Sequence, residues 1–270
     1  MTARRLFLLS LALLSLALVP GLPGAAPGEG VVRLPGGTFT PLFGVAPGKA
    51  TVTVAPFRMD ARPVTNLEFR RFVLAHPEWA PGAPPPELAD KTYLAHWKPA
   101  PGGALPFDPA QSRQPVVHVS WNAADAYCQA QGGRLPTVFE WEFAAAADET
   151  RPDASQDPAF AAAILAWYAA PTGAGGLPEV GRGHPDYWGL YDLHGLVWEW
   201  THDFDSLRFG AAASRAGDAP GGLYCGGGAL GSATREDYAA FMRFALRSSL
   251  EARFATAGLG FRCAYDATSR

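Results

Sequence analysis

The chain has 270 residues, of which 48% are hydrophobic and 17% are charged, and its formal net charge is −3. This apolar content is enough to form a sizeable core. The slightly acidic balance gives no electrostatic reason to expect a nucleic-acid or an anionic-membrane partner. The 30 glycines and 25 prolines are spread along the chain, which argues against long helices and for many turns. Because we find no internal repeat and no long linker, we expect one compact, irregular domain.

Residues 1–26 have the pattern of a signal peptide. Arg4 and Arg5 precede an apolar run over 6–19, and residues 20–26 supply the turn and the small side chains of a cleavage region. The apolar run is too short for a comfortable membrane span, and a buried N-terminal helix is the alternative interpretation. Removing the segment changes the net charge from −3 to −5. We therefore expect a periplasmic or secreted protein whose mature chain does not span a membrane.

The first predicted helix is defined by its two ends. Thr65 and Glu68 have the spacing of a capping box, in which each side chain binds the backbone near the other residue. Apolar residues follow at helical spacing, including Phe69 and Phe72, and the helix is expected to stop before Pro77. The sequence thus predicts a helix that starts at Thr65.

Two more helices are predicted from the same kind of signal. Ser120 can cap a helix that runs to the glycine pair at 132–133. Thr137, with Glu140 as its capping partner, can start another helix that carries Trp141 inward and runs into a series of alanines. These signals are local, so they predict helix ends without reference to the rest of the fold.

Short apolar runs predict strands at 52–57, 116–119 and 260–264. Proline and glycine dominate residues 80–114, where we expect a long excursion with little regular structure.

Six motifs in a fixed order resemble the formylglycine-generating enzyme (sulfatase-modifying factor) superfamily and span nearly the whole chain after residue 30. They are LPGGTF at 34–39, FRMDARPVTNLEFRRFV at 57–73, PVVHVSW at 115–121, GGRLPTVFEWEFAAAA at 132–147, GLYDLHGLVWEWTHD at 189–203 and LGFRC at 259–263. The resemblance implies one domain over 31–266 with an α+β, loop-rich, modified C-type-lectin-like fold. That fold consists of a small antiparallel sheet, a few helices and much irregular chain.

The superfamily that the chain resembles has several functions. It includes sulfatase activators, iron-dependent sulfoxide synthases of ergothioneine assembly, pyoverdine-maturation proteins and accessory proteins encoded beside copper nitrite reductases. The fold therefore does not determine the function. The function has to be inferred from the residues of the site.

A calcium site is expected in the stretch from 192 to 199. Asp192 and Glu199 are two carboxylates on either side of Gly195, where the backbone can bend, and Ca²⁺ prefers carboxylate and carbonyl oxygens. The resemblance implies that Asp192 and Glu199 bind by side chain, and Gly195 and Val197 by carbonyl. Leu196 replaces the asparagine that is usual in the family, but this position is not a ligand. The alternative is a pair of solvated acids on a turn beside a tryptophan core.

One disulfide is implied by the resemblance, between Cys128 and Cys263. An export signal makes this bond chemically reasonable, because disulfides persist in oxidising compartments. A second disulfide of the family would need cysteines at Ala145 and Phe244, and both positions are apolar here.

Formylglycine formation is not expected of this chain. In the family it needs two thiolates that bind Cu(I), a soft ion that prefers sulfur. The corresponding stretch here is 225–247, with Gly231 and the region of Ala239 where the resemblance would place the pair. Neither place has a cysteine, and Cys225 precedes the glycines.

The iron-dependent branch needs a compact set of histidines. His184, His194 and His202 are the only histidines that are near one another in sequence, and their spacing matches no compact ligand pattern. We expect surface or hydrogen-bonded histidines here rather than a metal triad.

The segment 225–247 is expected to be a strand that lines the functional groove. Cys225 is the candidate reactive or soft-metal-binding group, and Tyr238, Arg243 and Arg247 are the candidate ligand contacts, since phenol and guanidinium groups suit anionic or peptide groups. A simpler alternative holds for each residue: Cys225 as a small buried hydrophobe, and the arginines as partners of acids within the fold.

Two functions follow from these residues. The first is an accessory or maturation factor for an exported protein or peptide partner, with a copper enzyme among the candidates. The second is an oxidoreductase of the same superfamily with altered chemistry, acting on a peptide or a small molecule. The missing cysteine pair favours the first, with calcium as a structural ion and copper as the candidate second metal. The sequence leaves open whether the protein is an enzyme, its substrate or partner, its redox metal, its oligomeric state and its cleavage site.

Overall fold

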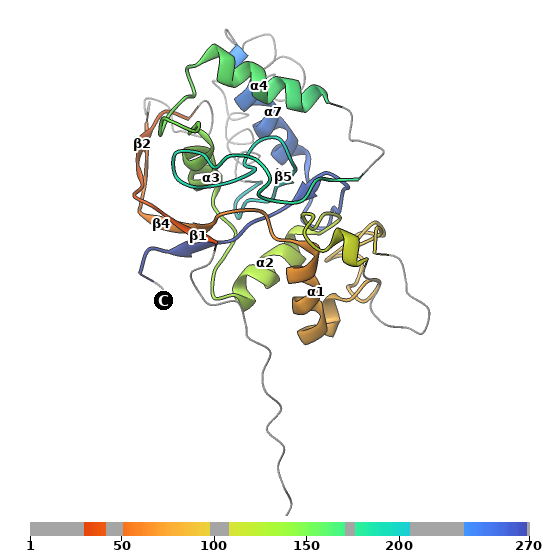
Figure 1. Cartoon of the computed structure of the whole chain (residues 1–270). Coiled ribbons are helices and arrows are strands. Elements are labelled where there is room, and N and C mark those ends of the chain that lie inside the picture. The colour runs from red at the N-terminus through yellow and green to blue at the C-terminus, as the bar shows by residue number, and fades with distance from the viewer. Residues whose placement is uncertain (1–29, 42–50, 98–107, 171–175, 206–234, 269–270) are drawn as a thin grey trace, which may run out of the picture.

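The computed structural model describes residues 30–41, 51–97, 108–170, 176–205 and 235–268. Short helices and strands alternate with long irregular connections, so the fold is α+β and loop-rich, as predicted (Figure 1). Helices α1 and α2 lie together at one end of the domain, and α4 lies beside α7 at the other end, with α3 and the strands between them. Within the described ranges, no helix combines the length and the apolar character that a membrane span needs.

The largest described sheet contains the first and the last described strands of the chain. Strands β1 (Val31–Leu34) and β7 (Ala264–Asp266) both pair antiparallel with β4 (Phe57–Asp60), which lies between them. There are two smaller sheets of two strands each in the described chain. In one, β2 (Gly37–Phe39) pairs antiparallel with β3 (Val52–Val54). In the other, β5 (Trp198–Glu199) pairs parallel with β6 (Leu259–Gly260).

Three strand predictions need correction. Residues 52–57 are not one strand: β3 ends at Val54 and β4 starts at Phe57, because Pro56 between them has no N–H for a ladder. Residues 116–119 form no strand, since His118 has a φ of 54°, a left-handed conformation that ends an extended run. The predicted strand at 260–264 is also divided, between β6 and β7.

All three predicted helices are confirmed. In each, the predicted N-cap hydroxyl accepts a hydrogen bond from a backbone N–H in the first turn, and two of the three caps are complete capping boxes. The helices are α1 (Asn66–Ala75), α2 (Trp121–Ala130) and α3 (Val138–Ala145). The glycine stop of α2 is confirmed as well, since Gly132 has a φ of 75°.

Two helices were not predicted. Helix α4 (Pro158–Ala169) starts at the Asp157 cap with proline in its first turn, and α7 (Arg235–Ser249) covers much of the segment expected to be a strand. The strand prediction for 235–247 is therefore wrong. In α7 the buried side chains of Phe241, Phe244 and Arg247 recur every three residues, which is a helical spacing rather than the alternation of a strand.

The irregular excursion predicted for 80–114 is confirmed where the structure describes it. Residues 80–97 and 108–114 contain turns and one short 3₁₀ helix, η2 (Pro109–Gln111). Another 3₁₀ helix, η1 (Pro77–Trp79), follows α1 directly and contains the proline at which that helix was expected to stop.

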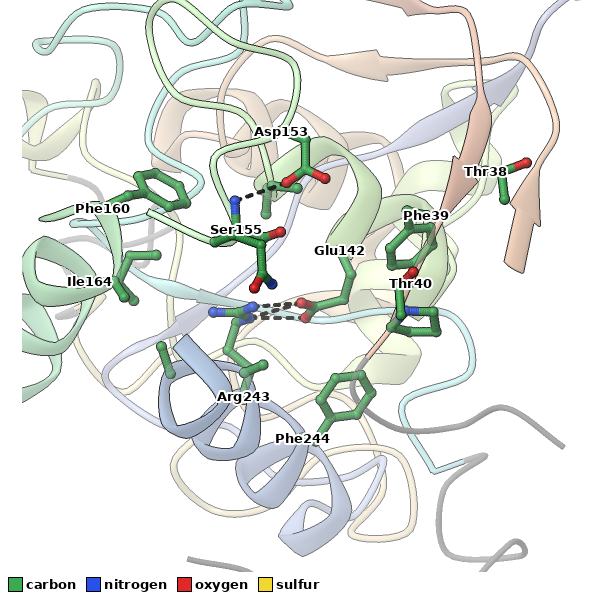
Figure 2. Close-up of a pocket in the computed structure, with 17 residues that line it drawn as sticks. Thr38, Phe39, Thr40, Glu142, Asp153, Ser155, Phe160, Ile164, Arg243 and Phe244 are labelled. Carbon is green, nitrogen blue, oxygen red and sulfur yellow. Dashed lines mark hydrogen bonds and ion pairs between the residues drawn. The ribbon is translucent and has the colours of Figure 1, made fainter. Parts of the chain in front are cut away.

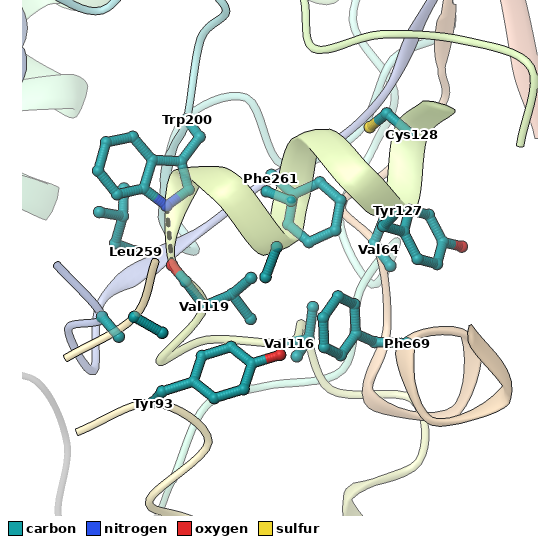
Figure 3. Close-up of a cluster of buried hydrophobic side chains, with 14 of the residues drawn as sticks. Val64, Phe69, Tyr93, Val116, Val119, Tyr127, Cys128, Trp200, Leu259 and Phe261 are labelled. Atoms are coloured by element: carbon teal, nitrogen blue, oxygen red, sulfur yellow. Dashed lines mark hydrogen bonds between the residues drawn. The ribbon is translucent and has the colours of Figure 1, made fainter. Parts of the chain in front are cut away.

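The main hydrophobic core lies between α1, α2 and the loops that follow them (Figure 3). The ring of Tyr127 packs against Phe69 and Phe261, with centroid distances of 5.7 and 5.3 Å. Trp200, which is fully buried, donates its indole N–H to the Val119 carbonyl at 2.8 Å. Of the described residues buried in this core, 15 precede position 136 and seven lie between Trp200 and Cys263, so the core joins distant parts of the chain.

The predicted disulfide is present in this core. Cys128 of α2 and Cys263, the residue before β7, are bonded, with 5.4 Å between their Cα atoms. Both residues are fully buried. The bond ties the second helix to the last strand across 135 residues of sequence.

Candidate functional site

A cavity of about 590 Å³ lies between α3, α4, α7 and the end of β2 (Figure 2). Four separate segments of the chain supply its walls, so the cavity depends on the whole fold. Its side chains include Phe39 and Thr40 at the end of β2, Glu142 of α3, Phe160 and Ile164 of α4, and Arg243 of α7.

Two arginines of α7 share one carboxylate at this cavity. Arg243 Nη2 and Arg247 Nη1 donate to the Glu142 carboxylate at 2.7 and 2.6 Å. The side chains of Arg243, Arg247 and Glu142 are 11%, 6% and 7% exposed, respectively, so the group is shielded from water. One negative and two positive charges leave a formal charge of +1 in a buried place, where electrostatic interactions are strong.

The arginines hold the Glu142 carboxylate in its ionised form. Burial alone would raise the pKa of Glu142, but the guanidinium groups of Arg243 and Arg247 outweigh it and lower this pKa to about 2. The carboxylate in turn raises the pKa of Arg243, against the effect of burial. Both arginines also lie over the indole ring of Trp141, with Arg247 4.7 Å from its centroid.

Tyr168 completes the surroundings of Arg243. Arg243 Nη1 donates to the Tyr168 hydroxyl at 3.3 Å, and that hydroxyl donates to the Ala239 carbonyl at 3.4 Å. Burial raises the pKa of Tyr168, so the phenol stays neutral near pH 7. With a carboxylate, a phenol and an aromatic face around it, Arg243 is held in one orientation beside the cavity.

The structure places the four sequence-predicted site residues differently. Arg243 lines the cavity, whereas Arg247 and Tyr238 do not. Tyr238 is 38% exposed and stacks on Phe241. Cys225 lies outside the described residues. The alternative weighed for the arginines, that they hold an acid of the fold, is therefore confirmed.

Sequence reasoning did not identify Glu142 as the acid that pairs with these arginines. The available signal was the carboxylate of Glu142 between Trp141 and Phe143 on a largely apolar helix. Glu140 on the same helix has the cap as its partner, whereas a second buried acid needs a partner of its own.

The cavity wall contains the place where the resemblance would put a catalytic cysteine. Ala239 is buried and lines the cavity, and so do Ala145 and Phe244, the positions of the missing second disulfide. The chain has three cysteines, and two of them form the disulfide in the core. The described wall of the cavity thus carries no thiol.

The predicted calcium loop is a tight turn. Asp192 and Gly195 have φ angles of 60° and 100°, so both adopt the left-handed conformation. The Asp192 carboxylate accepts a hydrogen bond from the backbone N–H of Gly181. The backbone bends at the predicted glycine.

Glu199 has other partners in this structure. Its carboxylate accepts from the Arg262 guanidinium at 2.8 Å and from the Trp141 indole N–H at 2.7 Å, and both charged side chains are fully buried. A calcium ion that used Glu199 would have to share this carboxylate with Arg262. In the part of the chain that the structure describes, no three His, Cys, Asp or Glu residues form a group that could hold a metal.

The three histidines considered for iron have separate roles. His194 Nε2 bonds to the Ala145 carbonyl at 2.9 Å, and His202 packs against Trp121 with 6.0 Å between ring centroids. His184 is exposed. The expectation of structural rather than ligating histidines therefore agrees with the described geometry.

Comparisons with known proteins agree with the motifs. A family model described as "Sulfatase-modifying factor enzyme 1-like domain" matches residues 20–267. The formylglycine-generating enzyme of Thermomonospora curvata is 32% identical over 88% of this chain and 94% of its own length. The inactive C-alpha-formylglycine-generating enzyme 2 of Mus musculus is 34% identical over 66% of this chain and 70% of its own length. The solved structure of PvdO from Pseudomonas aeruginosa is 20% identical, covers 87% of this chain and 94% of its own, and has a TM-score of 0.46.

Proposed function

The chain belongs to the sulfatase-modifying factor enzyme 1-like family, and from this premise we propose that it is a non-catalytic, exported accessory or maturation factor. It keeps the cavity of the fold but does not convert cysteine to formylglycine. Its proposed partner is an exported protein, and a copper enzyme is the class that the resemblance to nitrite-reductase-linked accessory proteins favours.

The cysteine count carries this proposal. Two thiolates are needed to bind Cu(I) in the way that the family chemistry requires. The chain has three cysteines, and the disulfide between Cys128 and Cys263 leaves Cys225 as the single thiol. One thiol cannot supply both ligands, whatever the position of residue 225.

Relatives of both kinds support the proposal. The protein of T. curvata is named a formylglycine-generating enzyme, whereas the mouse relative is named an inactive one. A member of this family that does not carry out the reaction therefore has a precedent at similar sequence identity.

We also propose calcium as a structural ion at the loop from Asp192 to Glu199. The left-handed conformation of Asp192 and Gly195 supports it, because a sharp bend in a short loop is what lets carboxylate and carbonyl oxygens bind one ion. Because Glu199 pairs with Arg262, the ion and the guanidinium group must share the Glu199 carboxylate.

The first experiment tests for the family reaction. Purified protein is incubated with Cu(I), oxygen and a peptide that carries the sulfatase motif, and aldehyde capture with mass spectrometry measures formylglycine. The enzyme of T. curvata is the positive control. We expect no conversion above a reaction without protein. Copper-dependent conversion that is lost in Cys225→Ser would show that the protein is an enzyme and would end the non-catalytic proposal.

The second experiment tests the accessory role in the source organism. The gene is deleted, and the activity and metal content of exported copper enzymes are measured with and without the restored gene. We expect at least one exported enzyme to lose activity and copper on deletion, and to regain both on complementation. If every exported copper enzyme kept its activity and its metal, the copper-enzyme role would be wrong.

A further inference from the structure

Among the described residues, Arg243 is the one cationic side chain that lines the cavity between α3, α4, α7 and the end of β2. The Arg243 side chain is 11% exposed and lines this cavity, so its accessible part faces the cavity. Figure 2 shows its guanidinium group in the middle of the wall residues, between Ile164 on one side and Glu142 on the other. A ligand in the cavity therefore meets a positively charged group.

The guanidinium group of Arg243 has more hydrogen-bond donors than its partners within the fold use. An arginine side chain carries five N–H groups. The Glu142 carboxylate accepts from Nε and Nη2 at 3.0 and 2.7 Å, and the Tyr168 hydroxyl accepts from Nη1 at 3.3 Å. Three of the five N–H groups thus have an acceptor, and one on each terminal nitrogen has none in the described part of the chain. A carboxylate has two oxygens that can accept from such donors.

The charge around Arg243 also favours an anion. Arg243 and Arg247 share Glu142, so this buried group has a formal charge of +1. The other acid of the wall, Asp153, is exposed and accepts a hydrogen bond from the backbone N–H of Ser155. Water and salt screen an exposed carboxylate, whereas a buried charge acts through a medium of lower dielectric constant. The buried positive charge is therefore the stronger influence on a group held against Arg243.

One part of the wall is apolar and defines a second feature of the ligand. Phe39, Phe160, Ile164 and Phe244 line the cavity, together with alanines of α3, α4 and α7. The cavity volume of about 590 Å³ lies within the range of about 300–1,000 Å³ that is usual for sites of small organic ligands. An inorganic anion leaves most of this volume and the apolar surface unused, whereas an aliphatic or aromatic body covers them. The wall therefore fits an anion that carries an apolar body.

Neutral polar side chains form the remainder of the wall. They are Thr38, Thr40, Ser155 and Gln156. Hydroxyl and amide groups both donate and accept hydrogen bonds, as the N–H and C=O groups of a peptide bond require. This part of the wall suits a carboxylate at the end of a polypeptide chain.

We propose that the cavity binds a carboxylate attached to an apolar body, with the carboxylate on Arg243 and the body against Phe160 and Ile164. The C terminus of an exported polypeptide that ends in apolar residues has this chemistry, and so has a free organic acid. The inference rests on the proposed function in one respect, that the cavity serves binding and not formylglycine formation.

Calorimetric titration with small probes tests the charge and the apolar body separately. The probe is 3-phenylpropionate, its neutral amide is the matched control for charge, and acetate is the control that lacks the apolar body. We expect saturable binding of 3-phenylpropionate and at least about tenfold weaker binding of either control, because a charge-assisted hydrogen bond and the burial of a phenyl ring each contribute this much. Equal affinity for the acid and its amide, equal affinity for acetate, or no saturable binding would each overturn the proposal.

The variant Arg243→Lys tests the residue itself. The lysine keeps a positive charge beside Glu142 but loses the planar pair of terminal nitrogens. Arg247→Lys is the matched variant, since it makes the same change at the other arginine that pairs with Glu142 and does not line the cavity. Circular dichroism confirms that both variants are folded. We expect Arg243→Lys to weaken binding of 3-phenylpropionate at least about tenfold and Arg247→Lys by less than about threefold. Equal losses in the two variants, or no loss in Arg243→Lys, would remove the role of Arg243.

A second measurement needs no variant and stays valid if Arg243→Lys fails to fold. A diazirine derivative of 3-phenylpropionate is photolysed with the parent protein, and peptide mass spectrometry locates the label. We expect label on the cavity wall, at Phe160, Ile164 or Phe244, and its loss when excess 3-phenylpropionate competes. Label that lies only outside the wall, or that persists under competition, would overturn the location.

Two further probes distinguish the sources of the carboxylate. If N-acetyl-leucyl-phenylalanine with a free C terminus binds more tightly than 3-phenylpropionate, the ligand is a polypeptide end, and the reverse order indicates a free acid. Either order supports the proposal, whereas equal binding of this dipeptide and its C-terminal amide contradicts it. These measurements need neither copper nor a partner enzyme. Their failure therefore leaves the accessory role to be decided by the formylglycine assay and the gene deletion.

Discussion

Replacing Glu142 by glutamine removes the carboxylate that compensates Arg243 and Arg247. The side chain keeps its size, so the change is mainly one of charge. Two buried guanidinium groups then lose their anion, and breaking a buried ion pair from one side costs about 3–5 kcal/mol. The lowering of the pKa of Glu142 from 4.5 to about 2 gives a separate figure of about 3 kcal/mol. The two magnitudes agree.

The pH dependence has a definite sign. The pKa of Glu142 is lower in the folded state than in the unfolded state, so its stabilisation is complete above pH 4.5. It is lost as the pH falls from 4.5 towards 2, where the folded protein also takes up the proton. The difference in free energy of unfolding between the parent and Glu142→Gln should therefore shrink over this range.

Urea denaturation followed by circular dichroism, at pH 7 and at several lower values, measures both effects. At pH 7 we expect a loss of about 3 kcal/mol and a fall in Tm of about 10 °C for a domain of this size. Glu251→Gln is the matched control, because Glu251 pairs with Arg253 where both side chains are about half exposed. Such a pair contributes less than about 1 kcal/mol. A loss below about 1 kcal/mol in Glu142→Gln, or a loss that is the same at pH 7 and pH 3, would refute this reasoning.

Two further predictions concern the calcium loop and the disulfide. Chelation should lower the Tm of the parent but not of the Asp192→Ala, Glu199→Ala double variant, because an ion bound only by the native state stabilises it; equal responses in a thermal scan would remove the calcium assignment. Replacing Cys128 and Cys263 by alanine should reduce the free energy of unfolding by up to about 5 kcal/mol, the chain-entropy value for a loop closed across 135 residues. Denaturation of the double variant beside the oxidised parent measures this loss, and a variant as stable as the parent would contradict it.

The sequence predicted those parts of the fold whose signals are local. The capping signals at Thr65, Ser120 and Thr137 each lie within four consecutive residues, and all three helices are present. The disulfide between Cys128 and Cys263 followed from the resemblance rather than from spacing, and it is present as well.

Features that depend on distant partners were missed or misassigned. Helix α7 was missed although Thr234 and Asp237 have the spacing of a capping signal in the sequence. Its arginines could be understood only with Glu142, about a hundred positions earlier in the chain. The run at 116–119 is rich in valine like a strand, but the left-handed conformation of His118 interrupts it. A cavity of about 450 Å³ combines residues from α4, from the loop after α3 and from the calcium loop, which no local pattern brings together.

The order of the central sheet has a consequence for biosynthesis. Strand β4 lies between β1 and β7, the first and last described strands, so the sheet cannot be completed until the ribosome has made almost the entire chain. Cys128 must likewise wait for Cys263, which at about 5–20 residues per second is a delay of roughly 7–27 s. During that interval the nascent chain has neither its closing strand nor its cross-link. If the protein is exported as proposed, its chain can be threaded through a narrow translocation pore in this state and complete its fold on the far side.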